Sequence, residues 1–168
     1  MNLSFLSGAG AFRLGFLAML LTGAVACKKD KTPEGPEYYM RFRANGVSIE
    51  YVQNTFAVFN NTSGLSNASF SGSTIESNMV LQIFWPDTIT EGTYTITPGP
   101  GSFIPAALFG YAVEGGLLFS SGNTGGDAVI NLTEIGPDYA RGTFSGVVTE
   151  TGEPDISITD GVFYLQQP

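Results

Sequence analysis

Short runs of alternating apolar and polar residues, separated by Gly, Pro, Asn and Asp, fill the chain from Tyr38 to its last residue. Such alternation places successive side chains on opposite faces of a β-strand, and the turn residues mark where a strand ends. Apolar residues at helical spacing are missing from this part of the sequence. The pattern therefore predicts an all-β fold for residues 38–168.

The clearest single element is a hairpin near the start of this region. Residues 38–44 alternate, with Met40 and Phe42 on one face. Asn45-Gly46 follows, and residues 47–51 alternate again. Asn-Gly is the strongest short-range hairpin signal because both residues accept a positive φ. The sequence therefore predicts two antiparallel strands joined by a two-residue turn.

The same reasoning extends along the rest of the chain. Further strands are expected at 55–59, 67–72, 79–85, 91–96, 106–113, 117–119, 127–135, 139–149 and 156–166. Residues 106–113 also permit a short helix, although Gly110 and the flanking glycines favour a strand. Because no crossover helix separates the strands, the sheets should be antiparallel. We expect an antiparallel two-layer β-sandwich, immunoglobulin-like or jelly-roll-like, with a closed β-barrel as the alternative.

Before this domain, an apolar run begins at Leu14 and ends in small residues just ahead of Cys27, the only cysteine of the chain. Apolar runs of this length behind a basic residue, here Arg13, are typical of signal peptides. Small residues before a lone cysteine resemble the lipobox of bacterial lipoproteins, which implies cleavage before Cys27 and lipidation of that residue. The alternative is an uncleaved transmembrane anchor, which needs about 20 apolar residues.

The resulting organisation has three parts. A lipoprotein signal peptide covers 1–26, a lipidated cysteine and flexible tether cover 27–37, and the β-sandwich covers 38–168. The tether contains two prolines and no large apolar residue, so it cannot bury a core. We expect a lipid-anchored protein of the bacterial outer membrane, facing the periplasm or the cell surface.

Charge and residue usage exclude several functions. After cleavage the chain carries six basic and fifteen acidic residues, a net charge of −9. A body this acidic repels phosphate backbones, so nucleic-acid binding is disfavoured. The chain has no histidine, and its one cysteine is expected to carry lipid. Disulfides, Ser-His-Asp or Cys-His catalysis and Cys/His zinc sites are therefore excluded.

Three short segments occur in a characteristic order: EGTYTI at 91–96, GTFSG at 142–146 and ITDGVF at 158–163. Together they resemble a family of uncharacterised Bacteroidota lipoproteins with "GtY", "GtFs" and closing "ItdGxF" segments. Because that family has no established activity, the resemblance implies a fold and a location only. Gly142 and Gly161 are expected at tight-turn or bulge positions next to strands, where a Cβ would clash.

Carboxylates are the first candidates for chemistry. Four acids lie in or after one predicted turn: Glu150, Glu153, Asp155 and Asp160. Two converging carboxylates can hydrolyse a glycoside without histidine, but acids in an exposed turn are held too loosely for this, and no catalytic residue is assigned.

The same acids could instead bind calcium, because calcium takes oxygen ligands and tolerates irregular loops. The candidate ligands are Asp155 with Asp160, or Asn123 with Asp127, and ordinary turn chemistry is the alternative.

Aromatic residues are the second class. Rings that carry a polar N–H or O–H group are common at binding surfaces. The candidates for a sugar-stacking surface are Trp85, Tyr94, Tyr111 and Tyr139. The alternative is that most of them fill the core. Thr88, in the tripeptide Asp87-Thr88-Ile89, resembles an O-glycosylation acceptor of exported Bacteroidota proteins and should lie in an exposed loop.

The function expected from the sequence is a membrane-anchored envelope lipoprotein, acting as a non-enzymatic binding or structural module. Its partners would be the membrane, through the lipid anchor, and a glycan or an envelope protein. The alternative is a carboxylate-dependent glycosidase or lyase acting on glycans. Apart from calcium, no cofactor is expected.

Overall fold

The computed structural model describes residues 38–99, 101 and 103–168, all of which fall in one unit of the chain. These residues form eleven β-strands and no helix. The strands are β1 (Tyr39–Ala44), β2 (Val47–Tyr51), β3 (Phe56–Asn60), β4 (Ser66–Ser73), β5 (Asn78–Trp85), β6 (Gly92–Thr95), β7 (Ala107–Ala112), β8 (Leu118–Ser120), β9 (Asp127–Ile135), β10 (Tyr139–Val148) and β11 (Ile156–Gln166). The all-β prediction is confirmed, and the ambiguous stretch 106–113 is a strand. The segments predicted as signal peptide (1–26) and tether (27–37) lie outside the described residues.

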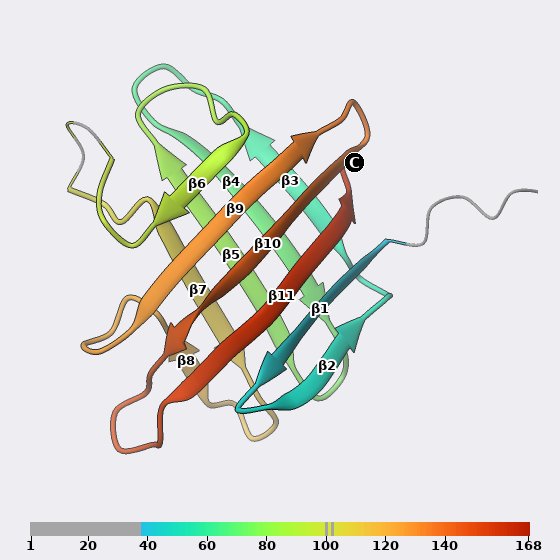
Figure 1. Cartoon of the computed structure of the whole chain (residues 1–168), viewed down its shortest axis with the longest axis vertical. Helices are drawn as coiled ribbons and strands as arrows, with labels where there is room; N and C mark the ends of the chain where they lie inside the picture. The colour runs from blue at the N-terminus through green and yellow to red at the C-terminus, as the bar shows by residue number, and fades with distance from the viewer. Residues whose placement is uncertain (1–37, 100, 102) are drawn as a thin grey trace, which may run out of the picture. The chain divides into compact units, whose positions relative to one another are not determined.

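The strands stack in two layers that cross each other (Figure 1). The front layer has the order β2-β1-β11-β10-β9-β6, and the back layer has the order β3-β4-β5-β7-β8. Pairing within each layer is antiparallel throughout. The predicted antiparallel sandwich is therefore confirmed. β5, whose sequence is almost entirely apolar, lies in the middle of its layer.

Two local contacts join the layers at their corners. At one corner Gln166 of β11 pairs with Phe56 of β3, the one parallel pairing among the described strands. At another, Ser120 and Thr149 exchange backbone hydrogen bonds of 3.0 and 3.1 Å. The path of paired strands begins at β6 and ends at β8. The structure is therefore a curled sandwich. It is not the closed barrel that the sequence analysis gave as the alternative.

The β1–β2 hairpin forms as the sequence predicts. Both turn residues have a positive φ, 48° at Asn45 and 82° at Gly46. Asn45 also ties the turn to the start of β11. Its backbone N–H donates to the Ser157 carbonyl (2.9 Å), and its side-chain oxygen accepts from the Ser157 N–H (2.8 Å). The hairpin is therefore fixed to a strand more than a hundred residues away.

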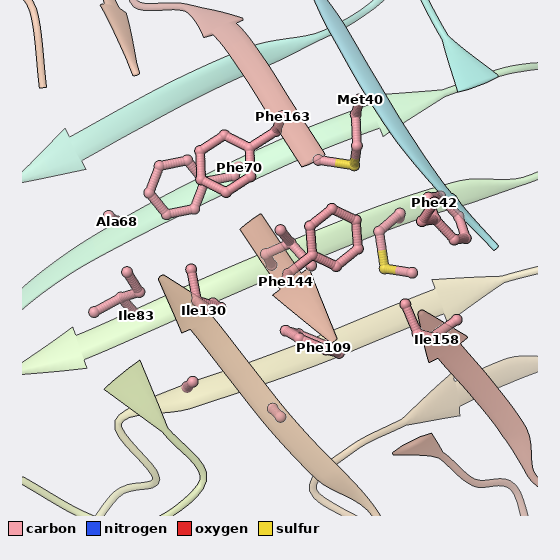
Figure 2. Close-up of a cluster of buried hydrophobic side chains, with 14 of the residues drawn as sticks. Met40, Phe42, Ala68, Phe70, Ile83, Phe109, Ile130, Phe144, Ile158 and Phe163 are labelled. Carbon is pink, nitrogen blue, oxygen red and sulfur yellow. The ribbon is translucent and has the colours of Figure 1, made fainter. Parts of the chain in front are cut away.

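The core lies between the layers and is rich in aromatic rings (Figure 2). Phe144 of β10 and Phe163 of β11 are 3% and 2% exposed. Each ring lies against a glycine on the neighbouring strand, since the register pairs Phe144 with Gly161 and Phe163 with Gly142. A Cβ on Gly161 would overlap the Phe144 carbonyl oxygen, and one on Gly142 would overlap the Phe163 ring. Both glycines are therefore required by close packing.

The three short segments at 91–96, 142–146 and 158–163, on which the family resemblance rests, all lie in the front layer, on β6, β10 and β11. The last segment contains a β-bulge, because the registers with β1 and β10 both shift around Asp160 and Gly161. Asp160 has a φ of 53°, a conformation that Asp tolerates better than most residues. The expectation of a bulge at Gly161 is therefore confirmed.

Candidate functional site

One row of side chains crosses the outer face of the front layer. The register places Tyr39 of β1 beside Tyr164 of β11, Tyr164 beside Arg141 of β10, and Arg141 beside Glu134 of β9. On β1, β10 and β11, buried residues next to this row point inward to the core, so the row points away from it. Four strands thus present aromatic and charged groups on one surface.

The rings pack around Tyr164, which is 9% exposed. Ring centroids of Tyr38, Tyr39 and Tyr139 lie 5.0, 6.4 and 5.4 Å from the centroid of Tyr164. The guanidinium of Arg141 lies 4.4 Å from the Tyr164 centroid, and that of Arg41 lies 4.3 Å from the centroid of Tyr39. Stacking of this kind is favourable and fixes the side chains in place. We call the group formed by Tyr38, Tyr39, Arg41, Glu134, Tyr139, Arg141 and Tyr164 the tyrosine–arginine face.

Hydrogen bonding and burial perturb two of these phenols. The Tyr139 hydroxyl donates to the Glu134 carboxylate, and this bond raises the pKa of Tyr139 above the ordinary value. Desolvation, together with the nearby Asp138 carboxylate, raises the pKa of Tyr38. Both phenols are therefore neutral at physiological pH and act as hydrogen-bond donors or acceptors.

Every basic side chain of the described residues lies on this outer surface, and each has an acidic partner. The pairs are Arg41–Glu50 at 3.9 Å, Arg43–Asp160 at 3.4 Å and Arg141–Glu134 at 3.5 Å. The pairs are exposed and contribute little to stability. Their main consequence is that the charges on this surface cancel locally, although the body as a whole is strongly acidic.

Further along the same surface, the bulge leaves a shallow hollow of about 350 Å³. Its side chains include Val129, Thr143, Ser145, Asp160 and Val162. Beside it, the Thr93 hydroxyl donates to the side-chain oxygen of Asn131 (3.2 Å). The outer surface thus combines rings at one end with hydroxyl, amide and short apolar groups at the other.

The structure does not gather the four aromatic residues singled out in the sequence. Trp85 and Tyr94 form an edge-to-face pair (5.3 Å), and the Tyr94 hydroxyl donates to the Thr90 carbonyl (2.7 Å). Tyr111 is 5% exposed, at the other end of the β5–β7 pair, with its ring edge-on to that of Phe42. Only Tyr139 belongs to the tyrosine–arginine face.

The acids are likewise distributed over separate places. Asp160 pairs with Arg43, whereas Asp155 is exposed in the β10–β11 turn, five residues away along the chain. Asn123, Glu150 and Asp155 line another hollow, and the Asn123 amide donates to the Thr149 carbonyl (2.7 Å). Asp127 accepts from the N–H of the next residue. Within 38–99, 101 and 103–168, no group of three or more acidic or other metal-binding side chains is placed to hold an ion.

Two sequence predictions concern modification. Thr88 lies exposed in the loop between β5 and β6, as expected, and its glycosylation remains a prediction. Cys27 lies outside the described residues. The described part of the chain has no helix long and apolar enough to cross a membrane.

Sequence reasoning missed most of the tyrosine–arginine face. The signal was the polar half of each alternating strand: Tyr39, Arg41 and Arg43 alternate with Met40 and Phe42. Rings on the polar face of a strand are candidates for a surface function, because the core is already supplied by the opposite face. No comparison with known families, curated proteins or solved structures gives a match for this chain.

Proposed function

We propose that this protein is a membrane-anchored envelope lipoprotein whose β-sandwich is a non-enzymatic binding module. The anchor would be Cys27, freed by removal of residues 1–26, and residues 27–37 would be the tether. The observation that supports the binding role is the gathering of four of the seven tyrosines, together with every described basic side chain, on one outer surface.

Tyrosine and arginine are the residues enriched at binding hot spots. Here the rings are held by one another and by Arg141, so binding would order few additional side chains. A pre-ordered surface of this kind loses less conformational entropy on association. Stability does not require such a cluster on the solvent side of a sheet, since the inner face of the same strands already forms the core.

The tether would keep this surface close to the membrane. Eleven residues from Cys27 to the start of the sandwich extend at most about 40 Å. Tyr38, the next residue, is itself part of the tyrosine–arginine face. A ligand of the face would therefore be a component of the envelope within that distance.

The anchor is tested by metabolic labelling with a fatty acid analogue. The wild-type chain should incorporate the label, and Cys27→Ser should remain unlabelled and uncleaved. Normal labelling and processing of Cys27→Ser would disprove the lipoprotein assignment.

The binding surface is tested by site-specific photo-crosslinking in intact cells. A photoreactive residue at Thr143, on the outer front surface, should form adducts. The same residue at Gln82, exposed on the outer surface of the back layer, should form few. Equal adducts at both positions, or none at Thr143, would contradict the assignment of the face.

A further inference from the structure

We infer that the ligand of the outer front surface is a neutral glycan chain, which lies from the tyrosine–arginine face toward the hollow beside Asp160. This inference rests on the proposed function, because it takes that surface as the binding surface. It specifies the chemical class of the ligand.

Charge is the first reason. Each arginine on the surface lies within 4 Å of a carboxylate, at 3.9, 3.4 and 3.5 Å. A phosphate, sulfate or acidic lipid head group would have to displace these carboxylates, and the acidic body would repel it. A cationic ligand would face the arginines. An uncharged ligand fits both constraints.

Hydrogen-bonding chemistry is the second reason. The hollow presents the Thr143 and Ser145 side chains, and beside it lie Asn131 and Thr93. Paired planar groups, such as the Arg141–Glu134 and Arg43–Asp160 pairs, offer a donor next to an acceptor. Adjacent hydroxyls of a sugar need that arrangement, because each hydroxyl both donates and accepts.

Ring placement is the third reason. Tyr164 is nearly buried and supports Tyr38, Tyr39 and Tyr139, which are each partly exposed. The exposed part of a ring can contact the apolar C–H face of a sugar while its hydroxyl stays in water. Along β11, Tyr164 and Asp160 are four residues apart, a length of about 13 Å. The surface is therefore long enough for a short oligosaccharide.

The test uses the full lipidated chain in a detergent without a sugar head group. The probes are an array of neutral gluco-, manno-, xylo-, galacto- and N-acetylglucosamine oligosaccharides, with sulfated and uronic-acid chains and anionic lipid vesicles as comparison. We expect binding to neutral oligosaccharides and none to the anionic probes. Calorimetry with the strongest neutral oligosaccharide then gives the affinity of each variant.

Arg141→Ala and Asn131→Ala should each weaken that affinity about tenfold, because each removes hydrogen bonds to the ligand. Gln82→Ala is the matched control, since it deletes a carboxamide from the opposite outer surface and should leave the affinity unchanged. Thermal unfolding of every variant shows that a loss of affinity is not a loss of fold.

Three results would overturn the inference: preference for an anionic probe, neutral-glycan binding that both front-surface variants leave intact, or a blank array. A blank array with crosslinks at Thr143 would reject the glycan and leave the binding face in place. A blank array without those crosslinks would reject both proposals.

Discussion

The two faces of β10 and β11 carry the same kind of side chain in opposite arrangements. On the inner face, Phe144 and Phe163 each cover a glycine of the neighbouring strand and are excluded from water. On the outer face, Tyr139 and Tyr164 pack against each other and against Arg141. One pair of strands thus supplies both the centre of the core and the centre of the candidate site.

The comparison shows that the contribution of an aromatic ring to the stability of this fold depends on how far the ring is buried. A ring in the core is stabilised by the apolar area that it removes from water. On the outer face, Tyr38, Tyr39 and Tyr139 stay partly exposed and remove less area, whereas Tyr164 beneath them is nearly buried. We therefore expect inner-face changes to alter stability and outer-face changes to alter binding, and four predictions test this separation.

The largest effect is expected from the inner rings. Phe144→Ala or Phe163→Ala should lower the free energy of unfolding by about 3–5 kcal/mol, because each leaves a cavity in the core. The half-buried Tyr39 is the outer comparison, and Tyr39→Ala should cost about 1 kcal/mol. Urea titration of the variants measures both. A loss below about 1 kcal/mol for either phenylalanine would show that the inner rings are not essential.

The next effect tests the glycines that receive these rings. Gly161→Ala should destabilise the fold by about 1–3 kcal/mol, because the new Cβ meets the backbone of Phe144. Gly110→Ala is the control. Its nearest neighbour would be a methyl carbon of Leu118 at 4.0 Å, so it should be neutral or slightly stabilising. Equal stability of the two variants would refute the close-packing explanation.

A smaller effect is expected in the pH dependence of stability, and it distinguishes the inner face from the outer face. Burial raises the pKa of Tyr51, a core tyrosine whose hydroxyl bonds to Ser77 (2.9 Å), to about 12. The unfolded chain loses this proton near pH 10, so the contribution of Tyr51 to stability should decline between about pH 10 and 12. Tyr51→Phe should remove that part of the decline.

On the outer face, the pKa of Tyr139 is raised mainly by its bond to Glu134. Glu134→Gln should therefore shift the ionisation of Tyr139 and leave that of Tyr51 in place. Ultraviolet titration of tyrosinate follows both groups. A change in the ionisation of Tyr51 in Glu134→Gln would argue against independent faces.

The smallest effect on stability is expected from Arg141. Arg141→Ala removes an exposed ion pair with Glu134 and contacts with two rings, which together should cost about 1 kcal/mol or less. Arg141→Lys, which keeps the charge, should cost less still. Thermal unfolding measures both, and a loss above about 3 kcal/mol would place Arg141 among the groups that hold the fold together.

Local sequence patterns were sufficient for most of the fold. The bounds of β9 and β11 agree with the alternation at 127–135 and 156–166. The glycines at 125–126 precede β9, and the turns 136–138 and 149–155, which contain Gly, Pro and Asp, follow β9 and precede β11. The Asn45-Gly46 hairpin followed from the φ preferences of its two residues. Short-range chemistry determines both features, so the sequence suffices to predict them.

The candidate site depends on long-range pairing, which no local pattern contains. Tyr39 reaches Tyr164 only because β1 pairs with β11, and Arg141 joins them only through the register of β10. Trp85 and Tyr111, for which the sequence left a sugar-stacking surface and the core as alternatives, are placed apart by their strands. Tyr111 belongs to the core, and Trp85 packs against it. Strand order and register are needed before the outer face can be recognised.

The placement of β1 also has a mechanical consequence. Under the proposed anchor at Cys27, a force on the sandwich would be transmitted to the chain at Tyr38, just before the start of β1. Because β1 is paired with β11 on one side and β2 on the other, a pull along the strand loads two rows of hydrogen bonds in shear. Bonds loaded in shear must break together, whereas bonds at a peeling end break one at a time. If the protein is anchored through Cys27 as proposed, this arrangement of β1 would suit it to bear load from its ligand.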